Sequence, residues 1–527
     1  MQDDMPEHGY SAGKTGGPAA TASDYDSLPY LSLPVSYTRP QHLAALAALS
    51  GSPAPAPDRA RVLELGCASG GNILPLAVHF PHARFVGVDL SARQISDGQR
   101  RIAALGLGNI ELHCADIATF AVAPAIYDYV ICHGVFSWVP LEVQDAIFRV
   151  IGAALAPGGV AAVSYNVLPG WHLRSPVRDL LLAHAGADGP PQERVRRARE
   201  ILKRFETLKS GDAYAALMRD EARRLARLPA SYILGEFLAE TNAPLAFDTF
   251  AARASTHGLA FLCEADLDAS AQALLDAPTR QHVAATAGGD RIRAGRMLDL
   301  FSGRPFRRSL LVRALADRKF AGPMPNHLAG LHIASGLTLD TARTTATSTA
   351  FTDRRGSRLA TTTASVGRVL RRLAEAYPST LPVDELAGTG AEGARGRRAL
   401  LSLVLEGRAG LSALPVTLGR GTEARPLVWA AARAEAALGL PFVTNLHHVT
   451  VALPKVAAAV SARLDGTRTR AEIVAWLAGE IAGGKISPTE DEPAALQSGV
   501  ETATAMAERH VAETLRHLAA SAVLLPN

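Results

Sequence analysis

Long hydrophobic runs, paired cysteines and an excess of charge of one sign are all missing from this 527-residue sequence. No stretch approaches the about 18 consecutive apolar residues that a membrane-spanning helix needs, which excludes such a helix. The first residues, MQDDMPEHGYSAGK, are polar and acidic and contain no apolar core of a secretion signal. From these absences we expect a cytoplasmic protein.

Cysteine is scarce, and its few positions lie far apart at Cys67, Cys114, Cys132 and Cys263. Their spacing matches neither a zinc site nor a small disulfide framework, so no metal is predicted. Cys114 and Cys132 fall in segments expected to be buried strands, and Cys67 falls in a glycine-rich loop. We interpret all of them as structural.

The balance of charge gives little indication of a partner. The 54 basic residues face 50 acidic ones, and a net charge of +4 is too small to indicate nucleic acid by itself. Hydrophobic residues make up 48% and charged residues 20%, which is typical of a globular chain and excludes wholesale disorder. A chain of this length is expected to form about two to four domains.

The N-terminal third of the sequence predicts a tail, an extended segment and an α/β domain. Residues 1–24 lack periodicity and predict a disordered tail. The segment YDSLPYLSLPVSYTRP at 25–40 alternates proline with apolar residues and predicts chain that lies extended on a domain surface. From Arg61, short apolar runs such as RVLELG, ARFVGVDL and YDYVICHG alternate with helical patterns. This alternation predicts a doubly wound parallel sheet with helices on both faces, within a core domain at 25–172.

The segment 173–315 interrupts the alternation and predicts a helical cap. Consecutive helices are expected over 173–241, followed by strand candidates at 259–264 and 306–314. One economical hypothesis is that these two late strands complete the core sheet, with the helices inserted between sheet elements.

The C-terminal part has an α+β composition and predicts two winged-helix-like modules, at 320–420 and 421–527. Short strands (RLATTT, LPVTLG and HHVTVAL) mix there with helices such as ASVGRVLRRLAEAY and RAEIVAWLAGEIAG. His447 and His448, adjacent in the last of these strands, would point to opposite faces and so make poor joint metal ligands. No repeat of fixed period occurs, which argues against a solenoid.

The sequence VLELGCASGGN, Val62 to Asn72, carries the strongest chemical signal and lies between a strand and a helix. Gly66 and Gly70 allow a tight turn and a close approach of a ligand to the backbone. Glu64 ends a buried strand, where a carboxylate is costly without a partner. The spacing E-x-G-x-x-x-G-G differs from the dinucleotide fingerprint G-x-G-x-x-G, and a carboxylate before the loop suits an amine-bearing ligand better than a phosphate.

Two further carboxylates follow the next two strands. Asp89 ends the second strand, where it can accept hydrogen bonds from ribose hydroxyls, and Asp116 follows the third, where it can accept from an adenine amine. Singly, a glycine loop is often a plain turn and a strand-end aspartate often a helix cap. Together they indicate a ligand with an amine, a ribose and an adenine but no phosphate, which is S-adenosylmethionine (SAM).

The motifs LELGCASGGN, FVGVDLS, CADI and LAPGGVAAVSYN resemble those of class I SAM-dependent methyltransferases. CHGVFSWVP, SYNVLPGWH and FAARASTHGLAFLCEADL resemble bacterial members with a methyltransferase regulatory domain, whose best-known examples methylate lysines of outer-membrane proteins. PFVTNLHHVTVALP resembles their C-terminal winged-helix region, whereas YTRP departs from the QTHP usual in this subgroup. The resemblance implies these cofactor-binding residues: Glu64, Gly66, Cys67, Gly70, Asn72, Asp89, Leu90, Asp116, Ile117, His133 and Gly134.

Aromatic residues on the carboxyl side of the sheet are candidates for guiding the methyl acceptor. Phe136, Trp138, Tyr165 and Trp171 are expected in loops there, and an aromatic wall would attract an ammonium group by cation–π interaction. The alternative, equally weighted, is that they pack beneath the helical cap. His133 is a candidate base, although a loop histidine more often only hydrogen-bonds the cofactor or backbone. The candidate catalytic residues are therefore His133, Trp138 and Tyr165.

The acceptor class implied by the resemblance is protein lysine, with a protein as the partner. No [DN]-P-P-[YFW] motif and no Pro-Cys pair appears, which argues against base-flipping and cytosine-C5 enzymes. A small-molecule or nucleic-acid acceptor, or a regulator that binds SAM without catalysis, stays open. An arginine cluster lies in the first winged-helix-like module and could contact phosphates. It comprises Arg354, Arg355, Arg358, Arg368, Arg371 and Arg372.

The ribose role of Asp89 can be tested by calorimetry with SAM. We expect Asp89→Ala to weaken SAM binding, because the carboxylate that accepts from the ribose hydroxyls is lost. Unchanged affinity in this variant would contradict the assignment.

Overall fold

The computed structural model describes residues 32–207, 209, 211–267, 275–315, 322–486 and 502–526. The predicted tail at 1–24 and the start of the extended segment, 25–31, lie outside the described residues. The described chain divides into two compact units. The smaller unit comprises Leu90–Gln94 and Pro176–Ala239, and the larger comprises the rest of the described residues.

A seven-stranded sheet forms the centre of the larger unit, with strand order β3-β2-β1-β4-β5-β7-β6. Strands β1 to β5 pair in parallel, as the alternation of strands and helices predicts. The strands are β1 (Arg61–Leu65), β2 (Arg84–Asp89), β3 (Ile110–Cys114), β4 (Tyr127–Cys132), β5 (Leu155–Asn166), β6 (Leu259–Glu264) and β7 (Phe306–Arg313).

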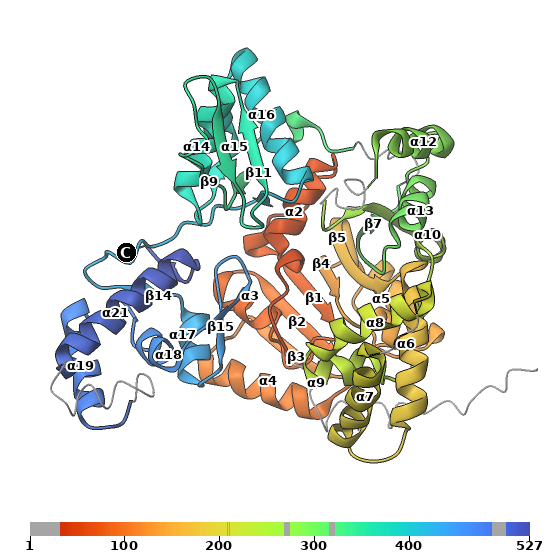
Figure 1. Cartoon of the computed structure of the whole chain (residues 1–527), viewed down its shortest axis with the longest axis horizontal. Helices are drawn as coiled ribbons and strands as arrows, with labels where there is room; N and C mark the ends of the chain where they lie inside the picture. The colour runs from red at the N-terminus through yellow and green to blue at the C-terminus, as the bar shows by residue number, and fades with distance from the viewer. Residues whose placement is uncertain are drawn as a thin grey trace, which may run out of the picture. The chain divides into compact units, whose positions relative to one another are not determined.

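The two late strands complete this same sheet in antiparallel orientation. β7 pairs with β5 from Ala161–Leu311 to Asn166–Phe306, and β6 pairs with β7. In Figure 1 the green β7 lies beside the yellow-orange β5, although about 140 residues separate them in the chain.

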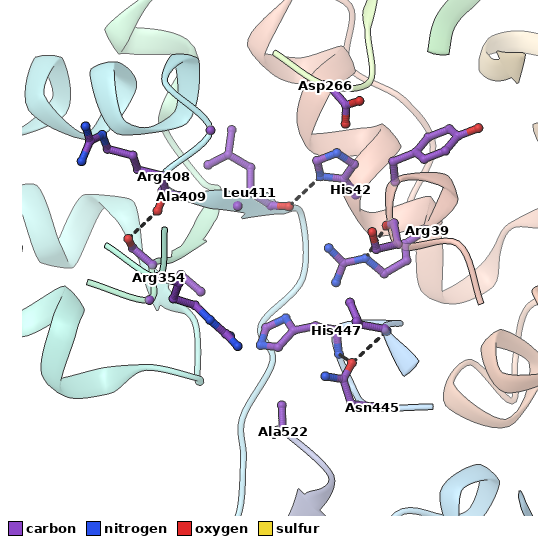
Figure 2. A pocket seen from close by; sticks show the side chains of 18 of the residues that line it. Arg39, His42, Asp266, Arg354, Arg408, Ala409, Leu411, Asn445, His447 and Ala522 are labelled. Atoms are coloured by element: carbon purple, nitrogen blue, oxygen red, sulfur yellow. Dashed lines mark hydrogen bonds between the residues drawn. The ribbon is translucent and has the colours of Figure 1, made fainter. Parts of the chain in front are cut away.

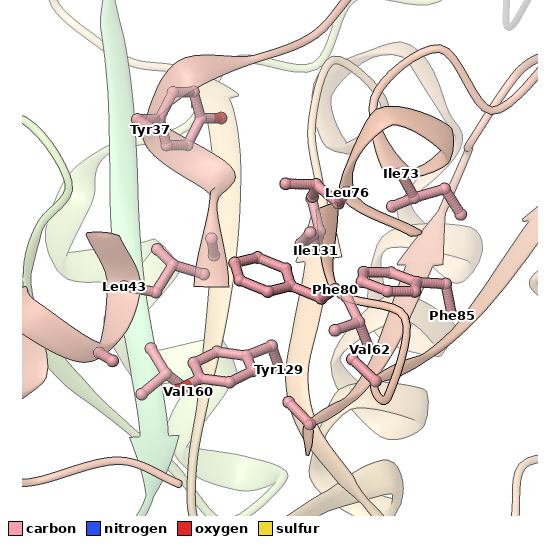
Figure 3. Packing of buried hydrophobic residues seen from close by; sticks show 14 of the residues in the cluster. Tyr37, Leu43, Val62, Ile73, Leu76, Phe80, Phe85, Tyr129, Ile131 and Val160 are labelled. Atoms are coloured by element: carbon pink, nitrogen blue, oxygen red, sulfur yellow. The ribbon is translucent and has the colours of Figure 1, made fainter. Parts of the chain in front are cut away.

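The sheet buries both faces because its strands are apolar at successive positions. Along β4, Tyr129 and Ile131 belong to one hydrophobic cluster, whereas Val130 and Cys132 belong to the cluster on the opposite face. Figure 3 shows the first cluster, in which Leu43 and Phe80 pack against the sheet.

Amphipathic helices supply the covering layers. In α5, Ile147, Phe148 and Ile151 are fully buried in the second cluster. The elements around the sheet are η1 (Ser36–Thr38), α2 (Pro40–Leu49), η2 (Pro57–Arg59), α3 (Ile73–His79), α4 (Ala92–Leu105), η3 (Phe136–Trp138), α5 (Leu141–Ala154), α10 (Phe247–Thr256), α12 (Ala277–Ala287) and α13 (Arg291–Ser302).

The smaller unit is helical, as the sequence over 173–241 predicts. Helix α6 (Gly170–Ala185) enters it, and Arg196 of α7 forms exposed ion pairs with Glu193 and Glu200, as a solvated helix face does. The other elements are α7 (Pro191–Glu206), α8 (Ala213–Ala226), α9 (Ala230–Tyr232) and the π-helical turn η4 (Ile233–Phe237).

Two further modules of the larger unit follow the sheet, each with its own hydrophobic cluster. The first contains η5 (Pro325–Leu328), β8 (His332–Ala334), β9 (Thr338–Leu339), β10 (Thr349–Thr352), β11 (Arg358–Thr361), α14 (Ala364–Ala376), β12 (Leu381–Pro382), α15 (Val383–Ala387), α16 (Gly390–Leu405) and β13 (Gly410–Ser412). The second contains β14 (Leu427–Val428), α17 (Ala430–Ala437), β15 (Phe442–Thr444), β16 (Thr450–Ala452), α18 (Lys455–Ser461), α19 (Arg470–Ala482), α21 (Ala503–Ala520) and β17 (Leu524–Leu525).

Three local predictions are wrong. LPVTLG forms no strand; the nearest strand, β13, ends before it at Ser412. His447 and His448 lie in the turn between β15 and β16, and the positive φ of 58° at His448 is incompatible with an extended strand. Cys114 is exposed at the end of β3, because β3 is the edge strand of the sheet.

No helix in the described part of the chain has both the length and the apolar composition that crossing a lipid bilayer requires.

Candidate functional site

The loop between β1 and α3 is shaped by glycines in backbone conformations that other residues rarely adopt. Gly66 and Gly70 have φ values of +76° and +73°. A Cβ atom added at Gly66 would lie 2.2 Å from a methyl carbon of Val135, in the loop after β4. The side chain of Cys67 is buried and packs toward Gly87 of β2, so its position is structural.

Glu64 is a buried carboxylate with one oxygen satisfied. Its Oε1 accepts a hydrogen bond of 2.7 Å from Nδ2 of Asn72, while Oε2 is buried and has no partner among the described residues. Burial, with a further contribution from the charge of Asp89, raises the pKa of Glu64 to about 8. An orphaned carboxylate oxygen of this kind fits a cationic ligand group, which would supply the missing charge and hydrogen bond.

Asp89 and Asp116 follow neighbouring strands at the same edge of the sheet as Glu64. Asp89 pairs with Cys114 in the β2–β3 register, and its Oδ2 accepts from the backbone N–H of Ala68 in the glycine loop at 2.8 Å. Asp116 lies two residues beyond β3 and accepts from the backbone N–H of Ala118. The three carboxylates therefore share the carboxyl edge of β1, β2 and β3.

The remaining cofactor candidates divide between core and surface. Ile117 is buried in the cluster beneath α5, whereas Leu90 directly follows Asp89 and belongs to the smaller unit, where it is exposed. A Cβ atom added at Gly134 would meet nothing within 4 Å, so the loop after β4 has open space beside it.

His133 begins this loop and is held by two hydroxyl groups. Its Nδ1 lies 2.6 Å from the Tyr37 hydroxyl and 3.0 Å from Oγ of Ser164, which also accepts from the Gly134 N–H. Burial and the charge of Arg308 lower the pKa of His133 to about 4, and burial raises the pKa of Tyr37 far above its usual value. The imidazole is therefore neutral and the phenol protonated near neutral pH.

The expected loop position is wrong for Tyr165 and for Trp171, which lies in the first turn of α6, whereas Phe136 lies in the short turn η3 after β4. Tyr165 belongs to β5, stacks on Phe250 at a centroid distance of 3.9 Å and shares a hydrogen bond with Ser309. Phe136 is fully buried beside Phe148. Both residues pack in the core, which favours the packing alternative for them.

The tryptophans form a pair of their own. Trp138 in η3 and Trp171 in the first turn of α6 make an edge-to-face contact at 6.0 Å between centroids. Trp171 is 1% exposed and Trp138 is 9% exposed. Of the two, Trp138 is therefore the better candidate for direct contact with a substrate.

Asn72 connects the loop to a distant part of the chain. Its Oδ1 accepts from the Val35 N–H at 2.9 Å and from Nε2 of His448 at 2.8 Å, and Thr38 also bonds to its amide. Burial and the charge of Arg39 lower the pKa of His448 well below its usual value, so the ring is neutral and donates from Nε2. Through Asn72, the C-terminal module fixes the amide that orients Glu64.

These residues offer a ligand three carboxylates, a glycine-lined turn and open space beside Gly134. Carboxylates at the ends of β1, β2 and β3 fit an ammonium, a ribose and an amino-substituted base in turn, and they do not fit a phosphate. The described residues contain no group of three or more side chains arranged to hold a metal ion. The donor set therefore fits SAM.

Comparison with known proteins agrees with the fold and with the class of cofactor. Three family models match: a methyltransferase domain over 62–159, the "predicted methyltransferase regulatory domain" over 229–313, and the "PKMT, C-terminal winged helix domain" over 424–523.

Two uncharacterized proteins of Rickettsia prowazekii are similar in sequence. One is 39% identical over 56% of this chain, which spans about half (53%) of that protein's length, and the other is 34% identical over 44% of this chain and 93% of its own length. The structure of PKMT2 from Rickettsia typhi in complex with AdoHcy has the same fold, with a TM-score of 0.82 and 24% identity over 94% of this chain and all of that one.

The fold and the carboxylate-lined edge of the sheet define a class I methyltransferase with SAM as its cofactor. Within this class, the chain belongs to the same family as the second Rickettsia prowazekii protein, and it also matches the regulatory-domain and PKMT winged-helix models.

Sequence reasoning missed Ser164, Arg308 and His448 at this site. Ser164 lies inside the quoted motif SYN, where its hydroxyl faces His133. Arg308 is on the late strand β7, and His448 lies 376 residues from Asn72, so no local pattern connects either to the loop.

The raised pKa of Glu64 predicts how the stability of the unliganded chain varies with pH. Between the usual glutamate value near 4.5 and about 8, the folded state keeps a proton that the unfolded state releases. The contribution of Glu64 therefore falls as pH rises through this window and is constant above it. We expect the free energy of unfolding to decline less with rising pH in Glu64→Gln than in the wild type. Denaturant titrations at several pH values measure this difference. Parallel profiles for the two proteins would show that Glu64 titrates normally.

The Asn72–His448 bond predicts that the C-terminal module contributes to SAM affinity. We expect His448→Asn, which keeps a residue that tolerates positive φ, to weaken SAM binding severalfold in calorimetry, since one hydrogen bond is worth about 1 kcal/mol. His447→Asn on the same turn is the matched control, because His447 bonds to the Pro378 carbonyl and not to Asn72. Equal affinities in the two variants would contradict the coupling.

Proposed function

We propose that this methyltransferase transfers the methyl group of SAM to lysine side chains of protein acceptors. The observation that carries the proposal is the union, in one compact unit, of the cofactor edge with a module matching the PKMT winged-helix domain, joined by the Asn72–His448 bond. The Rickettsia typhi protein with the same fold is named PKMT2, and its name and the match to the PKMT winged-helix model support a protein acceptor.

In this proposal the chain's main task is to hold two groups in line in a site from which water is excluded. Glu64, Asp89 and Asp116 would hold the amine, the ribose and the adenine. When bound, SAM supplies an activated methyl group on a sulfonium. The sulfonium end of SAM would lie toward the loop after β4, where Ser164 bonds to both His133 and Gly134.

A lysine must lose its proton before it can act as a nucleophile. His133, with a pKa near 4, is a weak proton acceptor, and Tyr37 stays protonated. The guanidinium of Arg308 lies 5.0 Å from the Tyr37 ring centroid, and its positive charge disfavours a second cation beside it. We infer that the amine is deprotonated by the lowering of its own pKa, with His133 as a positioning residue.

Space for a protein acceptor exists beside Tyr37. A cavity of about 720 Å³ opens there, lined by residues of the core and of both C-terminal modules. A volume of this size lies within the range of ligand pockets, and can admit a side chain together with neighbouring backbone.

We also propose that the protein acts in the cytoplasm.

Incubation with methyl-labelled SAM tests the acceptor class. We expect label to enter the protein fraction of a lysate, and mass spectrometry to place it on lysine Nζ atoms. Nucleic-acid and metabolite fractions serve as parallel acceptors. Label in either of these instead of protein would refute the proposal, and label in none would favour a regulator that binds SAM without catalysis.

The matched control pair is Asp89→Ala and Asp97→Ala. Asp97 is paired with Arg100 on the surface of α4, so its loss should leave transfer unchanged, whereas Asp89→Ala should abolish most of it.

A further inference from the structure

Arginine residues dominate the charge of the cavity beside Tyr37. The described residues that line it include one acid, Asp266, and five arginines: Arg39, Arg308, Arg354, Arg355 and Arg408. Figure 2 shows Arg39 and Arg354 extending toward the cavity from opposite sides, with His447 between them. A cavity with this excess of positive charge favours an anionic ligand.

Several of these cations already have partners in the described chain. Arg308 is paired with Asp266, and Arg408 lies 3.0 Å from Asp353. Arg354 donates to the Tyr377 hydroxyl. The charges of Arg308 and Arg408 are therefore compensated by acids, whereas Arg354 has a hydrogen-bond partner and keeps its charge.

Arg39 is different, because it is buried without an acid. Only 8% of it is exposed; its Nε donates to the Ser36 carbonyl at 2.9 Å, and its Nη1 is buried with no partner among the described residues. An unpaired nitrogen of a buried guanidinium is costly, and a carboxylate is the group whose geometry best satisfies it.

The surroundings of Arg39 provide no compensating negative charge. Burial lowers the pKa values of four nearby histidines, and the charge of Arg39 lowers them further: His42, His79, His447 and His448. These rings are therefore neutral and do not compete for an anion. No acid among the described residues is paired with Arg39, so the structure offers its unpartnered nitrogen to an anion from elsewhere.

Arg39 also lies close in sequence to the reaction site. Tyr37, two residues earlier, lines the same cavity and bonds to His133 in the loop after β4. An anion on Arg39 would thus belong to a ligand that also reaches Tyr37.

We propose that this cavity binds an acidic segment of the protein acceptor, with a glutamate or aspartate carboxylate paired to Arg39. The proposal rests on the proposed function for the identity of the acceptor. In the described chain, Arg39 is buried with an unpartnered nitrogen, whereas Arg308 and Arg408 are already paired with acids. This suits one carboxylate on a peptide better than a row of phosphates, which needs several free cations. The acidic residue would lie near the methylated lysine in sequence.

Fluorescence anisotropy with two labelled peptides tests this. One has a central lysine flanked by glutamates, and the other has glutamine at the same positions. The full chain is saturated with S-adenosylhomocysteine, so the readout does not need methyl transfer. We expect the wild type to bind the glutamate peptide about tenfold more tightly, as a charge-assisted hydrogen bond predicts.

Arg39→Gln should remove most of this preference, and Arg39→Lys should restore part of it. Because Arg39→Gln removes an unpaired buried cation, its melting temperature should not fall. Arg100→Gln, at an exposed ion pair on α4, is the matched control and should keep the preference. Equal binding of the two peptides by the wild type would overturn the proposal without reference to any variant.

Competitors identify the source of the anion. Free glutamate that displaces the peptide at equal carboxylate concentration would overturn the proposal in favour of a small anion. Displacement by a single-stranded oligonucleotide at lower concentration would overturn it in favour of nucleic acid. Lysine methylation without a glutamate preference refutes this site alone, whereas a glutamate preference without lysine methylation supports the site and refutes the proposed function.

Discussion

The buried hydrogen bond between Glu64 and Asn72 is the interaction on which the rest of the site depends. It fixes the position of the Glu64 side chain at the end of β1 and lowers its pKa, although burial is the larger effect and still raises that pKa to about 8. The amide oxygen of Asn72 also accepts hydrogen bonds from Val35 and His448. Asn72 therefore connects the N-terminal segment and the C-terminal module to Glu64. A change in any of the three therefore alters the surroundings of Glu64, the residue proposed to meet the ammonium group of the cofactor.

Neutral histidines surround this network, and their neutrality has a physical cause. Arg39 and Arg308 are cations close to buried imidazoles, so protonating His133 or His448 would place a second positive charge in a low-dielectric environment. The arrangement gives hydrogen-bond donors and acceptors whose state is constant near neutral pH. It also leaves Arg39 without a counter-charge, which is the basis for assigning an acidic ligand to the cavity.

Methyl transfer needs little acid–base chemistry when the leaving group is a sulfonium, and the residues of this chain are consistent with that. The two titratable groups bonded at the loop after β4 are weak proton acceptors near neutral pH: the pKa of His133 is about 4, and Tyr37 keeps its proton. Positioning is instead supplied by backbone turns at Gly66 and Gly70 and by bonds from Ser164.

The order of strands and helices, the glycine loop and the succession Glu64, Asp89, Asp116 could be predicted from sequence, because each depends on residues close together in the chain. Runs of successive apolar residues predict strands that are buried on both faces, and a strand-end carboxylate lies at the edge of a parallel sheet wherever the strand is placed. Tertiary structure decided the rest. Tyr165 lies in the core because it stacks on Phe250, and His448 bonds to Asn72 although 376 residues separate them. Such contacts depend on how separately folded segments pack, and packing leaves no periodic pattern in the sequence from which it could be read.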